Sequence, residues 1–405
     1  MAELPRTWRP RSSRHAGCSP ARAATHVSTA PRARAFLSLL VGLLATAAVA
    51  QQPASLDPAL LRTAIERALG AAPRGFETLL APAQTGVRVV DVDVQPIGAR
   101  RQRVTIDLSQ RTLTYDPSGD VEALLDQVVR STAALTAGAG DVEYRFLVDG
   151  LPLDRFLTAA PAGSRRLDRY GSGPMVVSAG HGWYWNEGAR GWRLQRDYYW
   201  GIVEDFVNWD LAQYVREELA AAGLATQPAR QPDRAAPPGV SGHPGWQEAA
   251  TYFLRALGAP PEVWGVGATD YNRDINSRPF YANWIGAAAV VSIHNNGGGG
   301  TGTETWYDTS NGLEAASARL AGIVNSHVVS AIRAHYSPAW PDRGLRSCNG
   351  CHGETRLALR PAVILEVAFM DTRSPDNDAL HDERFKRIVA RGIRDALLAW
   401  AALDD

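Results

Sequence analysis

The chain lacks an excess of charge of either sign and has little cysteine. Its 42 Lys and Arg balance 42 Asp and Glu, so the formal net charge is zero. Proteins that bind nucleic acid usually present a basic surface, and this composition gives no electrostatic reason to expect such a partner. Of the three cysteines, Cys18 lies in an N-terminal segment that we predict to be removed. The remaining pair, Cys348 and Cys351, predicts one short disulfide in an oxidising compartment.

The sequence also lacks an apolar run long enough to span a membrane. The longest run covers residues 35–50, whereas a spanning helix needs ~20 residues. It follows Arg32 and Arg34 in a segment without acids after Glu3, and it ends in the small-x-small pattern of residues 48–50. These features predict a secretory signal over residues 1–50 and export to the periplasm or cell envelope, with no stable span after cleavage. An uncleaved membrane anchor is the alternative.

The length of 405 residues predicts two domains, because single domains usually have roughly 100–200 residues. Residues 51–158 combine helical patterns with segments in which apolar and polar residues alternate. This mixture predicts a small α+β domain. The expected elements are a helix from about Leu56, strands over residues 86–92, 103–108 and 142–148, and a helix over residues 121–135. A polar, Gly-rich link over residues 159–173 ends this domain.

Three stretches of the N-terminal part are similar to a known accessory domain. The runs "RVTIDLSQ", "ALLDQVVRSTAAL" and "VEYRFLVDGLPL" resemble the small GerMN-type domain of germination and sporulation proteins. The stretch contains neither a cluster of metal-binding residues nor a paired nucleophile and base. We therefore predict a recognition or positioning module, which makes an envelope protein a candidate partner of this domain.

The C-terminal part, residues 174–405, alternates short apolar runs with helical patterns. Runs of this kind suit strands that are buried on both faces of a mostly parallel sheet. The pattern predicts a doubly wound α/β domain with its site at the carboxyl ends of the strands. The expected strands are residues 175–177, 287–293 and 362–365, and the expected helices are residues 203–219, 313–335 and 385–403. A Pro-rich stretch over about residues 228–260 is expected to be a surface insertion with one short helix, residues 246–257.

Four candidate site residues lie where such a sheet places its chemistry. His181 follows the first expected strand, His294 ends the second, Glu366 ends the third, and Glu204 begins a helix. Two imidazoles and one carboxylate form a zinc set that leaves a coordination position open, as in catalytic sites. The second carboxylate is then available as a general base. Glu366 is the most informative, because an acid inside the apolar run "PAVILEVAF" is costly to bury without a partner.

Four blocks of the C-terminal part resemble the zinc-dependent N-acetylmuramoyl-L-alanine amidases. They are "VVSAGHGW", "VEDFVNWDLAQYVREELAAAGL", "RPFYANWIGAAAVVSIHNNG" and "LRPAVILEVAFMDTRSPDNDAL". The resemblance implies that His181, Glu204 and His294 bind zinc and that Glu366 is the catalytic acid/base. It implies a substrate as well, the amide between N-acetylmuramic acid and L-alanine in peptidoglycan. Two departures are the Ser178-Ala179 pair, where the family usually has Asp-Pro, and the long insertion.

Other motifs are incomplete or ambiguous. The glycines of residues 297–300 lack a following Gly-Lys-Ser/Thr, and Ser178 lacks a Gly-x-Ser-x-Gly elbow, which argues against a phosphate loop and a serine hydrolase. Five tryptophans near the first block are suited either to stacking on sugar rings or to ordinary packing. They are Trp183, Trp185, Trp192, Trp200 and Trp209.

Residues 348–352 form the pattern Cys-Asn-Gly-Cys-His, which matches the attachment signature of a c-type haem. A cytochrome would need its own helices and a distal ligand, whereas this pattern lies in a loop before the third expected strand. We therefore predict a disulfide and no haem, with a reduced or metal-binding pair as a further alternative.

Two other functions remain open from the sequence. A carboxypeptidase-like zinc hydrolase would need an arginine for the terminal carboxylate of a peptide. The candidates are Arg273, Arg278, Arg356 and Arg360. A non-catalytic wall-binding regulator with the same fold is the second alternative, and the presence of all four site residues argues against it.

Overall fold

The computed structural model describes residues 53–70, 86–114, 121–157 and 173–403. The predicted signal segment, residues 1–50, and nearly all of the predicted link lie outside the described residues. Within these ranges, no helix combines the length and the apolar composition that crossing a membrane requires.

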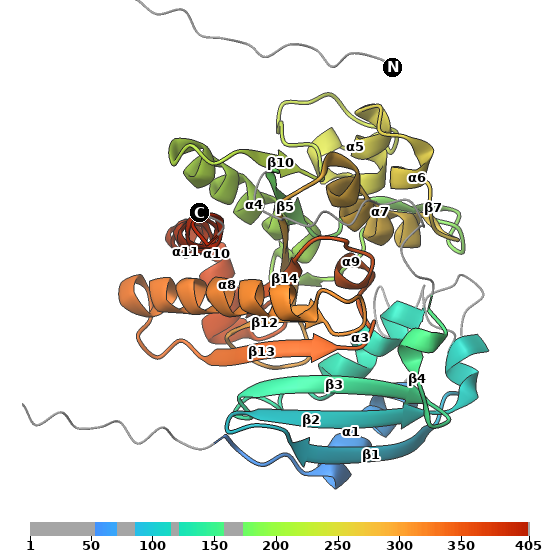
Figure 1. Cartoon of the computed structure of the whole chain (residues 1–405). Coiled ribbons are helices and arrows are strands. Elements are labelled where there is room, and N and C mark those ends of the chain that lie inside the picture. Colours follow the sequence, from blue (N-terminus) through green and yellow to red (C-terminus); the bar gives the residue numbers. More distant parts are fainter. Residues whose placement is uncertain (1–52, 71–85, 115–120, 158–172, 404–405) are drawn as a thin grey trace, which may run out of the picture. The chain divides into compact units, whose positions relative to one another are not determined.

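One ten-stranded sheet extends through the described chain (Figure 1). The strand order is β1-β2-β3-β13-β12-β14-β11-β5-β10, and β4 pairs with β3. The strands are β1 Val89–Pro96, β2 Arg101–Leu108, β3 Asp141–Val148, β4 Leu151–Pro152, β5 Met175–Ala179, β10 Thr226–Pro228, β11 Ala289–Asn296, β12 Thr303–Asp308, β13 Asp342–Cys348 and β14 Ala362–Phe369. Because β3 pairs in parallel with β13, the sheet continues across the domain boundary predicted from the sequence.

The C-terminal part of the sheet is mostly parallel and has helices on both faces, which confirms the predicted α/β class. The one antiparallel neighbour is β12, which pairs with β14 and was not predicted. Three long helices cover one face: α4 Glu204–Ala221, α8 Glu314–His335 and α11 Glu383–Ala401. The opposite face packs against α7 Asp270–Ile285 and the segment around the short helix α9 Gly353–Arg356. In the insertion, the expected helix forms as the shorter α5 Ala250–Ala256.

The N-terminal part places two helices, α1 Pro58–Gly70 and α3 Val121–Ser131, against strands β1 to β3. Their apolar core is continuous with residues of the C-terminal part. Trp306 of β12 and Ile364 of β14 belong to the same buried cluster, and the rings of Tyr144 and Trp306 stack with centroids 5.6 Å apart. The two parts therefore share a sheet and a core.

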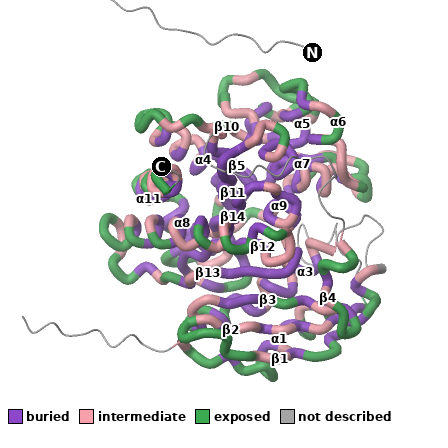
Figure 2. Tube along the Cα trace, viewed as in Figure 1, coloured by how far each residue is buried: buried purple, intermediate pink, exposed green. Residues whose placement is uncertain are grey.

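Alternation along the strands gives the two faces of the C-terminal sheet different chemistry. Successive side chains of a strand point to opposite faces. In β14, Leu365 packs into the cluster under α8 and α11, whereas Ile364 packs into the cluster with α3. Glu366 therefore shares the α3 face with Ile364. Figure 2 shows that the central strands are largely buried, and Glu366 is the partly buried residue of β14. The apolar run of β14 contains an acid because its alternate residues line two different faces of the sheet, and Glu366 lies on the face toward α3.

Candidate metal and catalytic centre

The first part of the centre is built where β5, β11 and α4 meet. His181 directly follows β5 and has a left-handed backbone, with φ of 65°, and Gly182 follows with φ of 134°. Gly180 lies against the imidazole of His294, so a Cβ at this position would come within 2.3 Å of that ring. Only glycine fits this close approach. Glu204 is the first residue of α4, and its carboxylate turns toward both histidines.

His181, Glu204 and His294, the three ligands predicted from the resemblance, bring one donor atom each to a single point. His181 Nε2 lies 3.0 Å from Glu204 Oε1, and His294 Nδ1 lies 3.1 Å from both atoms. Four ligands arranged tetrahedrally around zinc, with bonds of about 2.0 Å, are ~3.3 Å apart, so these separations are close to what the ion requires. All three residues are buried. The donor types and their spacing fit zinc.

Glu366 lines the same cavity as the three donors. It is opposite His294 in the β11–β14 pairing and opposite Glu304 in the β12–β14 pairing. Its Oε2 atom is buried and has no hydrogen-bond partner among the described residues. Burial raises the pKa of Glu366 to about 8. The charge of His294 acts to lower this pKa, and the negative charge of Glu204 acts to raise it further. The carboxyl group is therefore suited to taking up and releasing a proton near neutral pH.

The neighbouring acid Glu304 shows the contrasting case. It is buried as well, but Arg343 and Arg346 both contact its Oε2 atom, at 2.6 and 3.3 Å. Although burial acts to raise it, these two guanidinium groups hold the pKa of Glu304 below its usual range. Glu304 is a paired structural acid, which distinguishes it from Glu366 on the next strand.

Each histidine also has an outer partner that the sequence did not reveal. His181 Nδ1 lies 2.8 Å from Gln195 Oε1, and Gln195 Nε2 donates a hydrogen bond of 2.8 Å to Asp274 Oδ2. His294 Nε2 lies 3.1 Å from Glu354 Oε1. Gln195 lies in a bend of the chain, and Glu354 belongs to a four-residue helix. Neither lies in a motif whose spacing would have indicated a role.

Helix α3 of the N-terminal part covers the centre. Arg196 joins the two, because its Nε lies 3.3 Å from Glu204 Oε2 and its Nη2 lies 3.6 Å from Asp126 Oδ2. Glu122, one turn earlier in α3, accepts a hydrogen bond of 2.8 Å from the backbone of Gly353. The cavity that remains has about 40 Å³, enough for only a few waters of ~10–15 Å³ each on the same measure. Residues of α3 therefore form one wall of this small cavity.

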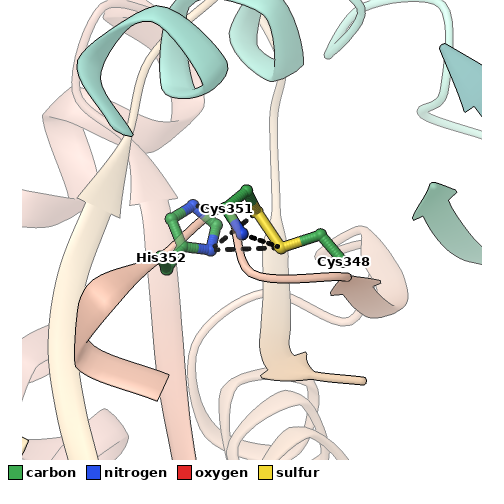
Figure 3. Close-up of side chains that lie close together, drawn as sticks. All are labelled: Cys348, Cys351 and His352. Atoms are coloured by element: carbon green, nitrogen blue, oxygen red, sulfur yellow. Dashed lines mark hydrogen bonds between the residues drawn. A yellow bond between two sulfur atoms is a disulfide. The ribbon is translucent and has the colours of Figure 1, made fainter. Parts of the chain in front are cut away.

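The predicted disulfide is confirmed, since Cys348 and Cys351 are joined (Figure 3). His352 lies beside it, with its Nδ1 3.3 Å from Cys351 Sγ, and its ring meets the edge of Trp306. Both sulfur atoms are used by the disulfide, whereas a metal would require thiolates. The disulfide and the imidazole of His352 therefore form a packed structural group.

The five tryptophans that the sequence singled out separate into two kinds. Trp209 is buried and packs on Trp246, which is the ordinary packing role. Trp185 and Trp200 are 38% and 47% exposed, and Trp185 meets Trp192 edge to face. Stacking on sugar rings stays a prediction for the exposed pair.

The arginines proposed for a terminal carboxylate do not gather at the centre. Arg273 pairs with Asp270. Arg278 is buried beside the histidines, and both ends of its guanidinium group contact acids of the protein itself, Asp274 and Glu354. The geometry therefore gives little support to a carboxypeptidase-like site.

Comparisons with known proteins identify the family of the C-terminal part. The sequence model of the family described as N-acetylmuramoyl-L-alanine amidase matches residues 175–399. A sporulation-specific N-acetylmuramoyl-L-alanine amidase of Bacillus subtilis is 32% identical over 124 residues, which are 31% of this chain and 44% of that protein. The chain thus spans less than half the length of this curated relative.

Solved structures of two amidases are also similar. The catalytic domain of CwlV from Bacillus (Paenibacillus) polymyxa var. colistinus is 22% identical, with 56% of this chain and 97% of that chain covered and a TM-score of 0.36. Ami1 of Mycobacterium smegmatis is 17% identical, with 58% and 100% covered and a TM-score of 0.40.

Proposed function

The chain belongs to the N-acetylmuramoyl-L-alanine amidase family, and on that basis we propose that it hydrolyses the amide between N-acetylmuramic acid and L-alanine in peptidoglycan. We further propose that the reaction depends on zinc held by His181, Glu204 and His294. Glu366 is proposed as the acid/base.

One observation carries the proposal. Three donor atoms of the types that zinc prefers lie 3.0–3.1 Å from one another, and the carboxyl group of Glu366 lines the same cavity. Two imidazoles and one carboxylate leave a coordination position open, which is the arrangement of a hydrolytic rather than a structural zinc site.

The residues divide the chemistry between them. When zinc is bound, it supplies Lewis acidity, lowering the pKa of water and polarising the amide carbonyl. Glu366 would take the proton from the attacking water and transfer it to the departing nitrogen. The raised pKa of Glu366, which results from its burial, suits both transfers near neutral pH. His181, Glu204 and His294 would hold the ion in place.

The proposal includes the setting of the enzyme. The predicted signal over residues 1–50 would direct export, so the protein would meet its substrate in the periplasm or cell envelope. The N-terminal α+β part would recognise or position the wall, with an envelope protein as a candidate partner. Residues of its helix α3 line the cavity, so a molecule bound to this part would influence access to the proposed zinc site.

Digestion of purified peptidoglycan tests the proposal. The exported form, which begins at Gln51, should release intact stem peptides that start with L-alanine, identified by mass spectrometry. A chelator should abolish release, and added zinc should restore it. The matched control is the Glu366→Gln protein, which at the same concentration should release peptides about a hundredfold more slowly or less.

Other outcomes identify the alternatives. Release of single C-terminal amino acids would indicate the carboxypeptidase-like hydrolase. Binding to the wall without any cleavage would indicate the non-catalytic regulator. Full cleavage by metal-free enzyme would disprove the zinc site while leaving the amidase reaction intact.

A further inference from the structure

The outer partners of the two histidines converge on one buried arginine. Arg278 of α7 contacts Asp274 through Nη2 and Glu354 through Nη1. Asp274 leads through Gln195 to His181, and Glu354 leads directly to His294. Every side chain in this chain of contacts is buried, and Arg278 is 1% exposed. A single guanidinium group therefore links the hydrogen-bond networks of both imidazoles, through the ring nitrogens that are not proposed to bind the metal.

The contacts on the His181 side determine which way each group faces. Arg278 has only donors and contacts the same oxygen of Asp274 as Gln195, so the hydrogen that this oxygen receives from Gln195 comes from the amide nitrogen. The amide oxygen of Gln195 then faces His181 Nδ1, at 2.8 Å. An oxygen acceptor requires a hydrogen on Nδ1, which leaves the lone pair of Nε2 directed at the centre.

The His294 side follows the same logic with the opposite ring nitrogen. Glu354 Oε1 receives the Arg278 donor and lies 3.1 Å from His294 Nε2, so Nε2 must carry a hydrogen. Ser292 donates to the other oxygen of Glu354, so both oxygens of this carboxyl group accept hydrogen bonds. His294 Nδ1 is then the ring nitrogen that faces Glu204 and the proposed metal position.

Arg278 also contacts the strained backbone of the first histidine. Its Nη2 lies 3.5 Å from the carbonyl oxygen of His181, whose φ of 65° is unusual for a residue with a side chain. Backbones of this kind persist when their surroundings hold them, and they occur at functional sites. The same guanidinium group thus meets the ring network and the main chain of His181.

We infer that Arg278 is a positioning residue that sets the proton positions of both imidazoles, acting through Gln195 and Asp274 on one side and through Glu354 on the other. This inference rests on the proposed zinc site. Outer partners that orient metal-binding histidines typically change metal affinity by about 10- to 100-fold when they are lost. Here one residue governs two ligands, so its replacement should affect zinc more than replacement of either branch alone.

Zinc affinity measured by competition with a chromophoric chelator tests the inference without relying on catalysis. Arg278→Lys keeps the charge but cannot contact two carboxylates as a planar fork does. We expect it to weaken zinc binding by about 10- to 100-fold, and Glu354→Gln and Gln195→Ala to weaken it less. The matched control is Arg343→Lys, because Arg343 is equally buried and pairs with Glu304, which has no contact with either imidazole.

The melting temperature of each metal-free variant separates positioning from folding. We expect Arg343→Lys to lower it while leaving zinc affinity within about twofold of the wild type, well below the loss expected for an outer partner. Equal loss of affinity in Arg343→Lys, or wild-type affinity in Arg278→Lys and Glu354→Gln, would overturn the inference. If Arg278→Lys does not fold, Glu354→Gln and Gln195→Ala decide the matter. A wild-type protein that binds no zinc would instead remove the proposed metal site, on which the inference depends.

Discussion

The two faces of the C-terminal sheet are made by the same strands but differ in what they bury. The face under α4, α8 and α11 is an apolar core, as Leu365 and Ile293 show. The face toward α3 and α7 carries His294 and Glu366 in the same two strands, and Glu366 lies inside β14 rather than at the end of a strand as predicted. Neighbouring residues of one strand therefore serve stability on one face and the proposed chemistry on the other. The role of a residue in these strands therefore depends on the face of the sheet on which it lies, and not on its distance from the proposed ligands along the chain.

The largest effect should come from the chemical face. Glu366→Gln preserves the side-chain volume but removes the base, so wall cleavage should fall by about a hundredfold or more, the usual scale for a positioned acid/base group. Zinc content and the melting temperature should stay close to those of the wild type. Cleavage assays and metal analysis of the same preparation measure both.

The roles of the two carboxylates would have to be exchanged if Glu366→Gln lost its zinc while Glu204→Gln kept it. Retained activity of Glu366→Gln would show that this residue is a buried structural acid. His294→Ala is the positive control for metal loss, since it removes a ligand.

The next largest effect should come from Leu365, which precedes Glu366 in β14 and lies on the apolar face of the sheet. Leu365 is fully buried, and Leu365→Ala removes core contacts and leaves a cavity. The free energy of unfolding should fall by about 2–5 kcal/mol. Urea denaturation measures this loss, and zinc affinity of the folded variant should not change. Weakened zinc binding in Leu365→Ala would show that the two faces are coupled. The division into a stabilising face and a chemical face would then be wrong.

The smallest effect should come from the disulfide at the end of β13. Cys348 and Cys351 lie in the core shared with the N-terminal part rather than among the proposed ligands. Replacing both by serine should cost about 2 kcal/mol, because the closed loop is short, and should leave zinc content unchanged. We also expect no haem absorption in the exported protein. A covalent haem mass on the peptide that contains both cysteines would contradict the assignment.

Much of the fold could be predicted from the sequence because its signals are local. The apolar runs at residues 175–177, 287–293 and 362–365 became β5, β11 and β14, and the helical periodicity of residues 313–335 became α8. The strands β12 and β13 were missed. Buried polar residues, such as Glu304 of β12 and Arg346 of β13, interrupt the apolar pattern of these strands. The two residues can be buried because they form an ion pair with each other, and the sequence pattern does not show this pairing.

The proposed ligands were accessible from the sequence for a related reason. Strand ends and helix starts can be located along the chain, and the ends of parallel strands meet at one edge of a sheet. His181, Glu204 and His294 could therefore be expected to converge, and their donor atoms do so. Glu366 was visible because an acid in an apolar run is costly to bury.

The sequence by itself determined the class of the sheet, the residues at the centre and the cysteine pair, since these depend on periodicity and on residue type at predictable places. Only the tertiary structure decided that α3 covers the centre and that Arg278 connects the outer partners of both histidines. It also decided that the sheet continues from β3 into β13. These features join residues far apart in the chain through side-chain directions and strand pairing, and such contacts leave no periodic signal in the order of amino acids.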